Sequence, residues 1–322
     1  MPEQQPEARP AGPRRLPFKQ LLVVLGLAAT LYAAALLLAG GDGLRLALTR
    51  LWSATGLQAA LLCLASYVLR GLRWRTWMAL HGRNFGLLQG LRLYLAGYAF
   101  TPTPGNIGEA MRGLMLARQP LSARQSLGIF GAERLADLLC LLLLCLPAAV
   151  WAWQRGPLNL LPAWSAGWGG LALLAMGLLL AFAAWCWHRR KALAVRLAWL
   201  QDAGACLQMR PWIWLGLSLA AWSGQGLAVW LVCTEAGLQV SVPTASSFYA
   251  LAMVAGALSA LPAGLGGTEA VLTGLLVASG AGTAVALGIT VLVRLLTLWL
   301  AVAIGLLALL YSAAIARDID FR

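Results

Sequence analysis

A charged motif, Glu133-Arg134-Leu-Ala-Asp137, opens a run with eight leucines between Leu135 and Leu146. Burying one charge in a bilayer costs about 2.5–3.5 kcal/mol, whereas one leucine returns about 0.3–0.6 kcal/mol. The leucines therefore cannot offset three unpaired charges, so these side chains must pair, take up protons or lie at shallow depth. Arg134 and Asp137 are three residues apart and can pair, and Glu133 shares a helix face with Asp137. The cluster indicates either a site for a polar substrate or a structural lock between helices.

Two stretches rich in proline and glycine interrupt apolar segments with a similar order of residues. Residues 101–112 and 261–270 each read proline, glycine, glycine and then Glu-Ala, which predicts two broken helices. In lipid, a broken helix is tolerated where its backbone is buried in protein or lines a wet cavity, and matching breaks in two halves are typical of transporters. The expected break residues are Pro102, Pro104, Gly105, Gly108, Pro262, Gly264, Gly266 and Gly267.

The ionisable residues expected at membrane depth are unequal in number. The carboxylates are Glu109, Glu133, Asp137 and Glu269, and the cations are Arg112, Arg134 and Arg294. Three pairs would leave one carboxylate over, which makes proton coupling a hypothesis. We expect these residues, together with Asn106 at the first break, to line a polar cavity where the two breaks meet near the midplane.

The composition identifies the class of protein. Of the 322 residues, 61% are hydrophobic and 11% are charged, against about 25% charged in soluble domains. Apolar runs of about 20 residues recur, each long enough to cross a bilayer. The sequence therefore predicts an all-α polytopic integral membrane protein with six full spans, two oppositely oriented re-entrant hairpins and pseudo-symmetric inverted halves.

The expected organisation follows these runs. We predict a disordered cytoplasmic tail at 1–18 and a first membrane half at 19–188, with a hairpin at 87–118. An amphipathic cytoplasmic connector at 189–210 leads to a second membrane half at 211–314, with a hairpin at 245–281, and a cytoplasmic tail follows at 315–322. The net charge of +13 is mostly arginine in short loops, which by the positive-inside rule places both termini in the cytoplasm. No basic domain for nucleic acid is indicated.

Arg70 and Arg73 are expected where a span ending near Leu69 meets the cytoplasmic loop. They share a helix face, so they serve either as a topology signal or as contacts for lipid phosphate. The six cysteines form no Cys-x-x-Cys motif and lie mostly in apolar runs. We expect no metal site and no cofactor.

Four elements, taken in order, resemble the flippase-like family of lysylphosphatidylglycerol synthase transmembrane regions. They are Arg70-Gly-Leu-Arg73-Trp74, Pro104-Gly-Asn-Ile-Gly108-Glu109 with Arg112, Glu133-Arg134-Leu-Ala-Asp137, and Pro262-Ala-Gly264-Leu-Gly266 with Glu269. The resemblance covers residues 19–314, and its most specific part is Glu-Arg-Leu-x-Asp. About ten residues follow Tyr311, so we expect a stand-alone member that lacks the aminoacyl-transfer domain.

The resemblance implies a lipid translocase of the bacterial inner membrane and not an enzyme. Its substrate would be an anionic phospholipid, a glycolipid or a lipid linked to polyprenyl phosphate, and a lipid-modifying enzyme is a further expected partner. Two alternatives stay open. One is an integral-membrane enzyme acting on a lipid-linked phosphate or sugar, in which Glu133 and Asp137 hold Mg²⁺. The other is an accessory subunit with structural ion pairs only.

Overall fold

The structure is a computed structural model built from helices, and it describes residues 26, 29, 30, 33, 41–114, 116, 120–154, 197–259 and 261–315. The first part of the chain holds α2 (Gly41–Leu51), α3 (Ala54–Leu80), α4 (Leu87–Ala96), the 3₁₀ turns η1 (Gly97–Phe100) and η2 (Pro104–Ala110), α5 (Met111–Leu114) and α6 (Ala123–Gln154). The second holds α9 (Trp199–Gln208), α10 (Pro211–Glu235), α11 (Val242–Leu258), the 3₁₀ turn η3 (Pro262–Gly264), α12 (Gly267–Ala278), α13 (Thr283–Arg294), η4 (Leu295–Trp299) and α14 (Leu300–Ile315).

Several helices have the length and composition of membrane spans. Among the described residues, Ala54–Leu80, Pro211–Glu235 and Thr283–Ser312 meet both conditions, and Val242–Leu258 and Pro262–Ala278 are shorter apolar helices. Helix α6 has 32 residues and is therefore about 48 Å long. The predicted span at 169–187 and tail at 1–18 lie outside the described residues, as does most of the predicted span at 21–38.

Local signals explain where these helices begin. The Ser53 hydroxyl accepts a hydrogen bond from the Gly56 amide at 3.0 Å and caps α3, and Ser241 caps α11 in the same way. A proline at the first helical position opens α10, where its missing amide hydrogen has no partner to lose.

Helix α3 corrects one expectation. It continues to Leu80, eleven residues beyond the predicted end at Leu69, so Arg70 and Arg73 lie inside a helix and are buried. The positive-inside rule reads an arginine cluster as a loop, but Trp74, Trp77 and Met78 continue the buried face of this helix past both arginines.

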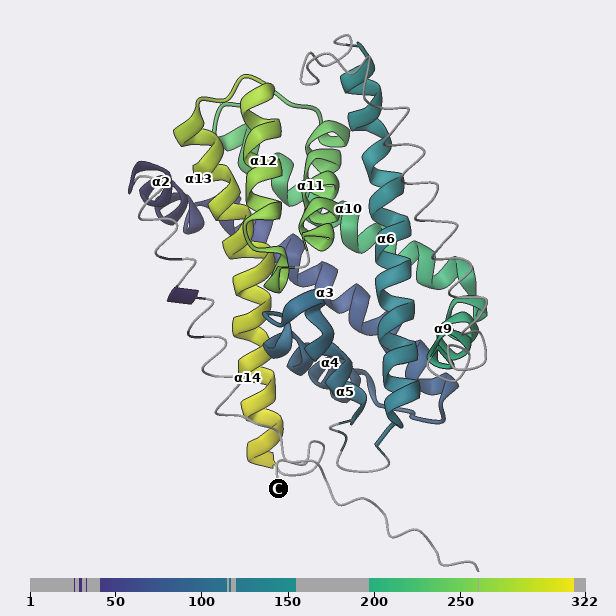
Figure 1. Cartoon of the computed structure of the whole chain (residues 1–322). Coiled ribbons are helices and arrows are strands. Elements are labelled where there is room, and N and C mark those ends of the chain that lie inside the picture. The colour runs from purple at the N-terminus through teal and green to yellow at the C-terminus, as the bar shows by residue number, and fades with distance from the viewer. Residues whose placement is uncertain are drawn as a thin grey trace, which may run out of the picture.

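The two predicted breaks are present. Helix α4 tightens into η1 and is followed by η2 and α5, whereas α11 ends before η3 and α12 begins just after it. The turns η2 and η3 contact each other. In Figure 1, α11 and α12 occupy the upper half and α4 and α5 the lower half, so the interrupted segments approach the centre from opposite ends.

The two breaks also share a backbone conformation. In each, a proline precedes two residues with positive φ: Gly105 (61°) and Asn106 (55°) after Pro104, and Ala263 (54°) and Gly264 (66°) after Pro262. Glycine and asparagine tolerate this left-handed region, but alanine does not. The repeat seen in the sequence is therefore a repeat of structure.

The strained alanine gives a prediction. Replacing Ala263 by glycine is expected to raise the free energy of unfolding by up to about 1 kcal/mol, because glycine has no Cβ to clash at positive φ. The matched control is Ala205→Gly at an exposed position of α9, which is expected to lose about 0.5–1 kcal/mol. Denaturant unfolding in detergent measures both changes, and equal losses in the two variants would contradict the prediction.

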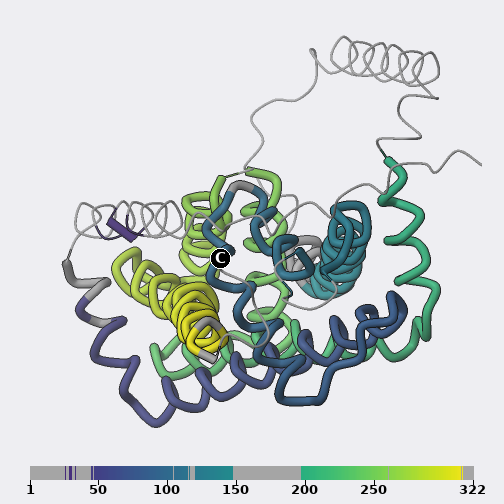
Figure 2. The backbone as a smooth tube through the Cα atoms, turned by 90° about the horizontal axis from the view of Figure 1, so that it is seen from below, coloured from purple at the N-terminus to yellow at the C-terminus, as the bar shows by residue number. Residues whose placement is uncertain are grey.

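The packing brings both halves around the centre. Helix α3 packs along α10, α6 packs against α11 and α9, and α14 packs against α4 and η1. Seen from below in Figure 2, α14 and α6 are viewed nearly end-on, and the segment with α4 and α5 crosses between them. The interrupted segment of the first half is thus enclosed by helices of both halves.

A π-helical turn, η4, joins α13 to α14. The Tyr67 hydroxyl of α3 hydrogen-bonds to the carbonyl oxygens of Leu296 (2.9 Å) and Thr297 (3.0 Å) in this turn. Such turns insert one extra residue into a helix and occur often at functional sites.

Candidate functional site: a buried arginine and carboxylate cluster beside a cavity

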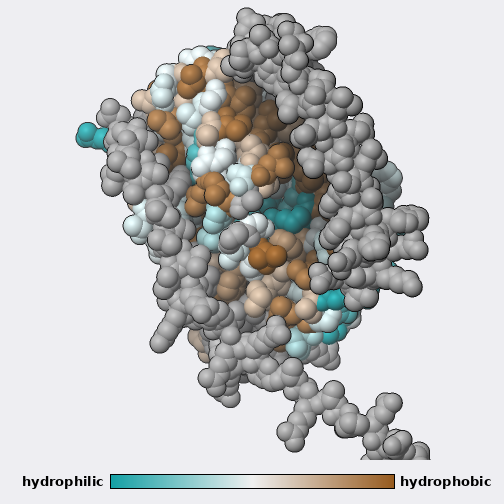
Figure 3. Space-filling model, in the orientation of Figure 1, coloured by the Kyte–Doolittle hydropathy of each residue, from teal (hydrophilic) through white to brown (hydrophobic). Residues whose placement is uncertain are grey.

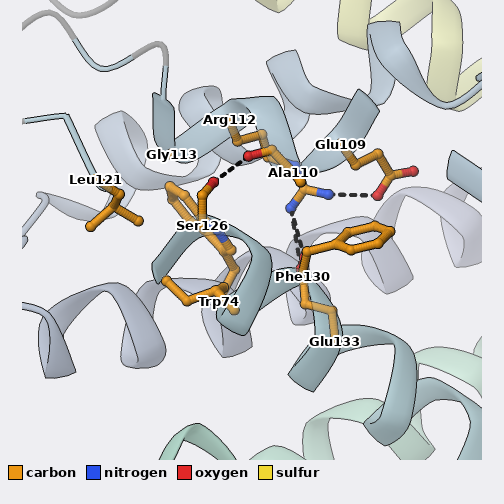
Figure 4. Close-up of a pocket in the computed structure, with 10 residues that line it drawn as sticks. Trp74, Glu109, Ala110, Arg112, Gly113, Leu121, Ser126, Phe130 and Glu133 are labelled. Carbon is orange, nitrogen blue, oxygen red and sulfur yellow. Dashed lines mark hydrogen bonds and ion pairs between the residues drawn. The ribbon is translucent and has the colours of Figure 1, made fainter. Parts of the chain in front are cut away.

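Arg112 lies at the centre of the first group of ion pairs. Its Nη2 donates to Glu109 at 2.5 Å and its Nη1 donates to both oxygens of Glu133 at 3.1 and 3.3 Å (Figure 4). The predicted pair between Glu109 and Arg112 is confirmed, and Glu133 joins it from α6. The guanidinium also lies 4.4 Å from the centre of the Tyr94 ring.

Room for this arginine depends on small neighbours. A Cβ on Gly97 would overlap the Arg112 side chain, so only glycine leaves space there. Next to the pair, the Ser126 hydroxyl donates to the Ala110 carbonyl and ties α6 to η2 (Figure 4). The remaining space in this pocket is about 10 Å³, so the group is closely packed.

Asp137 is the centre of the second group. Its Oδ1 accepts from Arg73 at 2.7 Å and from the indole nitrogen of Trp222 at 3.2 Å, and Ser218 accepts from the same arginine nitrogen. The predicted pair with Arg134 is also present, at 3.5 Å. Arg73 is therefore a buried partner of Asp137 and not a loop residue.

Arg134 is held loosely between the two groups. It approaches Glu109 at 3.4 Å and Asp137 at 3.5 Å, and its side chain is 35% exposed. Its Nε is buried and has no hydrogen-bond partner among the described residues. This arginine can exchange one of its carboxylates for another anion with little loss of contact.

The second half repeats one ion pair of the first. Glu269 pairs with Arg294 at 2.7 Å across 25 residues, the same separation as between Glu109 and Arg134. Arg294 also donates to the Ala263 carbonyl at 2.8 Å, and Glu269 accepts from the Gly266 amide at 2.7 Å. Arg294 thus holds the second break closed, whereas Arg134 makes no such backbone contact among the described residues.

Arg70 differs from the other buried arginines. Its side chain donates to Gln225 at 3.0 Å and stacks over Trp222 at 3.9 Å, but it forms no ion pair with a described carboxylate. Its Nε is buried without a hydrogen-bond partner in the described part of the chain, and the residue is 8% exposed.

The charge count expected from the sequence is therefore wrong. Five arginines, not three, accompany the four carboxylates, because α3 carries Arg70 and Arg73 into the interior. Each of the four carboxylates has at least one arginine partner. The excess charge within the described cluster is one cation, so the proposed leftover carboxylate for proton coupling is not found there.

A cavity of about 80 Å³ lies where the two breaks meet. Arg70, Arg134 and Arg294 all line it, as do Asn106 and Glu109 from the first break and Ala263 from the second. Its other lining residues are Tyr67, Tyr98, Thr101, Trp222, Gln225, Tyr249, Met253, Thr297, Leu298 and Ala301. In Figure 3 a hydrophilic patch lies in a hollow near the middle of the molecular face, surrounded by hydrophobic side chains.

The predicted proline and glycine residues of the two breaks pack around the cavity but are not among its lining residues. Gly108 packs so closely on Phe100 that a Cβ would lie 2.8 Å from the phenylalanine Cβ, and a Cβ on Gly264 would lie 3.1 Å from the Cα of Gly256. Pro102 is buried, Gly266 has a positive φ of 84°, and Gly267 begins α12. Five predicted site residues do not line the cavity: Arg73, Arg112, Glu133, Asp137 and Glu269. Of these, Asp137 pairs with Arg134 and Glu269 pairs with Arg294, which do line it.

Sequence reasoning missed the neutral part of the wall. Gln225 is a fully buried amide in the apolar helix α10, and its position among leucines, alanines and tryptophans was a usable signal. Tyr67, Tyr98 and Tyr249 gave no such signal, because a tyrosine is equally at home at a membrane interface.

The carboxylates face arginines and not one another. Glu133 accepts from Arg112 and the Oδ1 atom of Asp137 from Arg73, whereas the Oδ2 atom of Asp137 has no hydrogen-bond partner among the described residues. Within the described residues, no group of three or more histidines, cysteines, aspartates or glutamates is arranged to hold a metal.

Comparison with known proteins places the chain in a family. Residues 22–305 match the family described as the lysylphosphatidylglycerol synthase TM region. The chain is also similar to a UPF0104 membrane protein of Methanothermobacter thermautotrophicus, with 32% identity over 103 residues that cover 32% of this chain and 30% of that relative. The family match spans most of the sequence, and the long apolar helices agree with it. The chain is a multi-pass integral membrane protein that belongs to the lysylphosphatidylglycerol synthase transmembrane region family.

Proposed function

We propose that this protein moves an anionic lipid between the leaflets of a bacterial cytoplasmic membrane. The observation that carries the proposal is Arg70, a buried arginine that forms no ion pair with a described carboxylate, in the wall of a cavity where two broken helices meet. A buried cation is costly in a membrane unless an anion joins it, so a phosphate headgroup is the natural complement.

The positions of the two breaks suggest the route that the lipid takes through the protein. The headgroup enters the cavity beside Arg70 and Arg134, while the lipid tail stays in the bilayer along the exposed apolar side chains of Ile107 and Leu261 at the tips of the breaks. Arg134 releases Glu109 or Asp137 as it takes the phosphate and returns to them as the headgroup leaves. Arg294 holds the second break in place throughout.

The proposed topology has six full spans, two re-entrant hairpins of opposite orientation and both termini in the cytoplasm. The opposite approach of the two interrupted segments supports the inverted arrangement of the halves (Figure 1). We further propose that the lipid leaves unchanged, so the protein is a translocase and not an enzyme. An enzyme that makes or consumes the lipid is a fitting partner.

The experiment is lipid movement in proteoliposomes. Purified protein is reconstituted with fluorescent phosphatidylglycerol, phosphatidylethanolamine or a prenyl phosphate, and the label on the outer leaflet is quenched over time. Wild type is expected to move an anionic lipid, and Arg70→Gln is expected to slow it at least tenfold, a loss of about 1.4 kcal/mol in transition-state stabilisation. Glutamine removes the positive charge together with the guanidinium that donates to Gln225 and stacks over Trp222.

Arg124→Gln is the matched control for this experiment. Arg124 pairs with Asp202 at 2.9 Å on the surface, so its loss is expected to leave the rate unchanged. Mass spectrometry of the recovered lipids tests whether any bond was broken. Movement of no lipid by folded wild-type protein, or chemical turnover of the lipid, would contradict the proposed function.

A further inference from the structure

We propose that the cavity selects a headgroup with a single negative charge, of the phosphodiester class, and that Gln225 sets this selectivity. The inference rests on the proposed function and adds the charge of its substrate. A phosphodiester occurs in phosphatidylglycerol and in a sugar linked through phosphate to a polyprenyl chain, and both present the same singly charged group.

The first step is the charge of the described cluster. Five arginines and four carboxylates leave one positive charge, and among the described residues Arg70 is the arginine that forms no ion pair, although Asp137 attracts it from a longer distance. Uncompensated charge is expensive at low dielectric constant, so the complex is most stable when the headgroup cancels one charge and no more. A doubly charged phosphomonoester leaves one negative charge in the interior, and a neutral headgroup leaves one positive charge.

The second step concerns the hydroxyl groups around the cavity. Tyr67 hydrogen-bonds to backbone carbonyls, Tyr98 to Tyr94, Tyr249 to Gln225, and Thr101 to Glu109. These hydroxyl protons are used within the protein, whereas the Nε atoms of Arg70 and Arg134 are buried without partners. Among the described lining residues, the charged donors left for a ligand are therefore guanidinium groups, with the neutral amide of Asn106 beside them.

The third step explains how Arg70 keeps its charge available. The Gln225 carbonyl oxygen accepts from Arg70 at 3.0 Å and from Tyr249 at 3.1 Å, and the Gln225 amide nitrogen donates to Ser66 at 3.0 Å. This network fixes the amide and holds the guanidinium over Trp222. Because glutamine is neutral, it orients Arg70 without cancelling its charge, so Gln225 is a positioning residue.

Two substitutions of nearly equal shape change the cavity charge in opposite directions. Gln225→Glu places a carboxylate against Arg70 and brings the net charge to zero. Glu109→Gln raises the net charge to two, while Arg112 keeps Glu133 and Arg134 keeps Asp137. Gln208→Glu on the exposed face of α9 introduces the same chemical change away from the cavity and serves as the control.

The test measures rates for four fluorescent lipids in proteoliposomes at about pH 8, where a phosphomonoester is doubly charged. They are phosphatidylglycerol, a polyprenyl phosphodiester of a sugar, phosphatidic acid and phosphatidylethanolamine. Wild type and Gln208→Glu are expected to move a phosphodiester fastest. Gln225→Glu should lower the ratio of phosphatidylglycerol to phosphatidylethanolamine at least tenfold, and Glu109→Gln should raise the ratio of phosphatidic acid to phosphatidylglycerol at least fivefold.

The outcomes separate the two proposals. If wild type moves lipids but neither ratio changes in the folded variants, charge matching is wrong and the translocase proposal stands. If wild type moves no lipid, the translocase proposal itself fails. Because the two variants shift the charge in opposite directions, a general loss of activity in one of them cannot imitate the expected pair of shifts. The relative rates of the two phosphodiesters identify the lipid that carries the group.

Discussion

Replacing Arg112 by methionine is expected to destabilise the folded protein by about 3–5 kcal/mol, because it removes the partner of two buried carboxylates. Arg112 is 4% exposed and bonds to Glu109 at 2.5 Å and to Glu133 at 3.1 Å. Methionine preserves most of the side-chain volume next to Gly97, so the loss reports charge and not packing. Unfolding in detergent with increasing denaturant, followed by circular dichroism, measures the change.

The control for this prediction is Arg124→Met. Arg124 also forms an ion pair, with Asp202 at 2.9 Å, but its side chain is 50% exposed. Surface pairs of this kind contribute about 0.2–1 kcal/mol, so the loss should be several times smaller than at Arg112. Similar losses in the two variants would show that Glu109 and Glu133 are stable without Arg112, and the description of this group as a charged core would then be wrong.

Gly305→Ala is expected to cost about 1–3 kcal/mol, because α14 crosses η1 there with backbone against backbone. A Cβ at residue 305 would lie 2.7 Å from the Tyr98 carbonyl carbon and closer still to the Ala99 amide nitrogen. Backbone atoms cannot rotate away as the end of a side chain can, so α14 must shift away from the first half. The measurement is again the unfolding free energy, combined with the rate of lipid movement.

Gly216→Ala provides the comparison for the crossing. Gly216 lies inside α10, and a Cβ there would meet no atom within 4 Å. Alanine is a better helix former than glycine, so this variant is expected to gain up to about 1 kcal/mol. Should Gly305→Ala be as stable as Gly216→Ala, the close approach of α14 to η1 would not exist in solution.

Much of the architecture could be predicted because it depends on local sequence. The helix breaks follow from proline and glycine, the pair of Glu109 and Arg112 follows from a spacing of three, and the repeated Pro-Gly order predicts two related halves. The contact between η2 and η3 agrees with the prediction that the breaks meet. Six spans, the membrane midplane and the roles of these residues in transport stay predictions.

The rest depends on contacts between distant residues. The partner of Arg73 is 64 residues away at Asp137, and the partner of Arg70 is 155 residues away at Gln225. The spacing of residues along one helix cannot reveal such pairs. The positive-inside rule treats arginines as loop residues, so the sequence placed Arg70 and Arg73 at a membrane surface. In the structure their partners in other helices make the burial of both side chains possible. The error changed the sign of the net charge assigned to the cluster.

The π-helical turn gives the two halves of the protein a fixed angular relation. A single continuous rod runs from α13, whose Arg294 holds the second break, to α14, which lies against α4 and η1 of the first half. Each residue advances an α-helix by about 100°, so one extra residue at Leu295–Trp299 rotates the face of α14 relative to that of α13. We therefore expect a rotation of α13 about its axis to rotate α14 as well. The hydrogen bonds from the Tyr67 hydroxyl to the π-helical turn fix the rotational position of this continuous helix relative to α3.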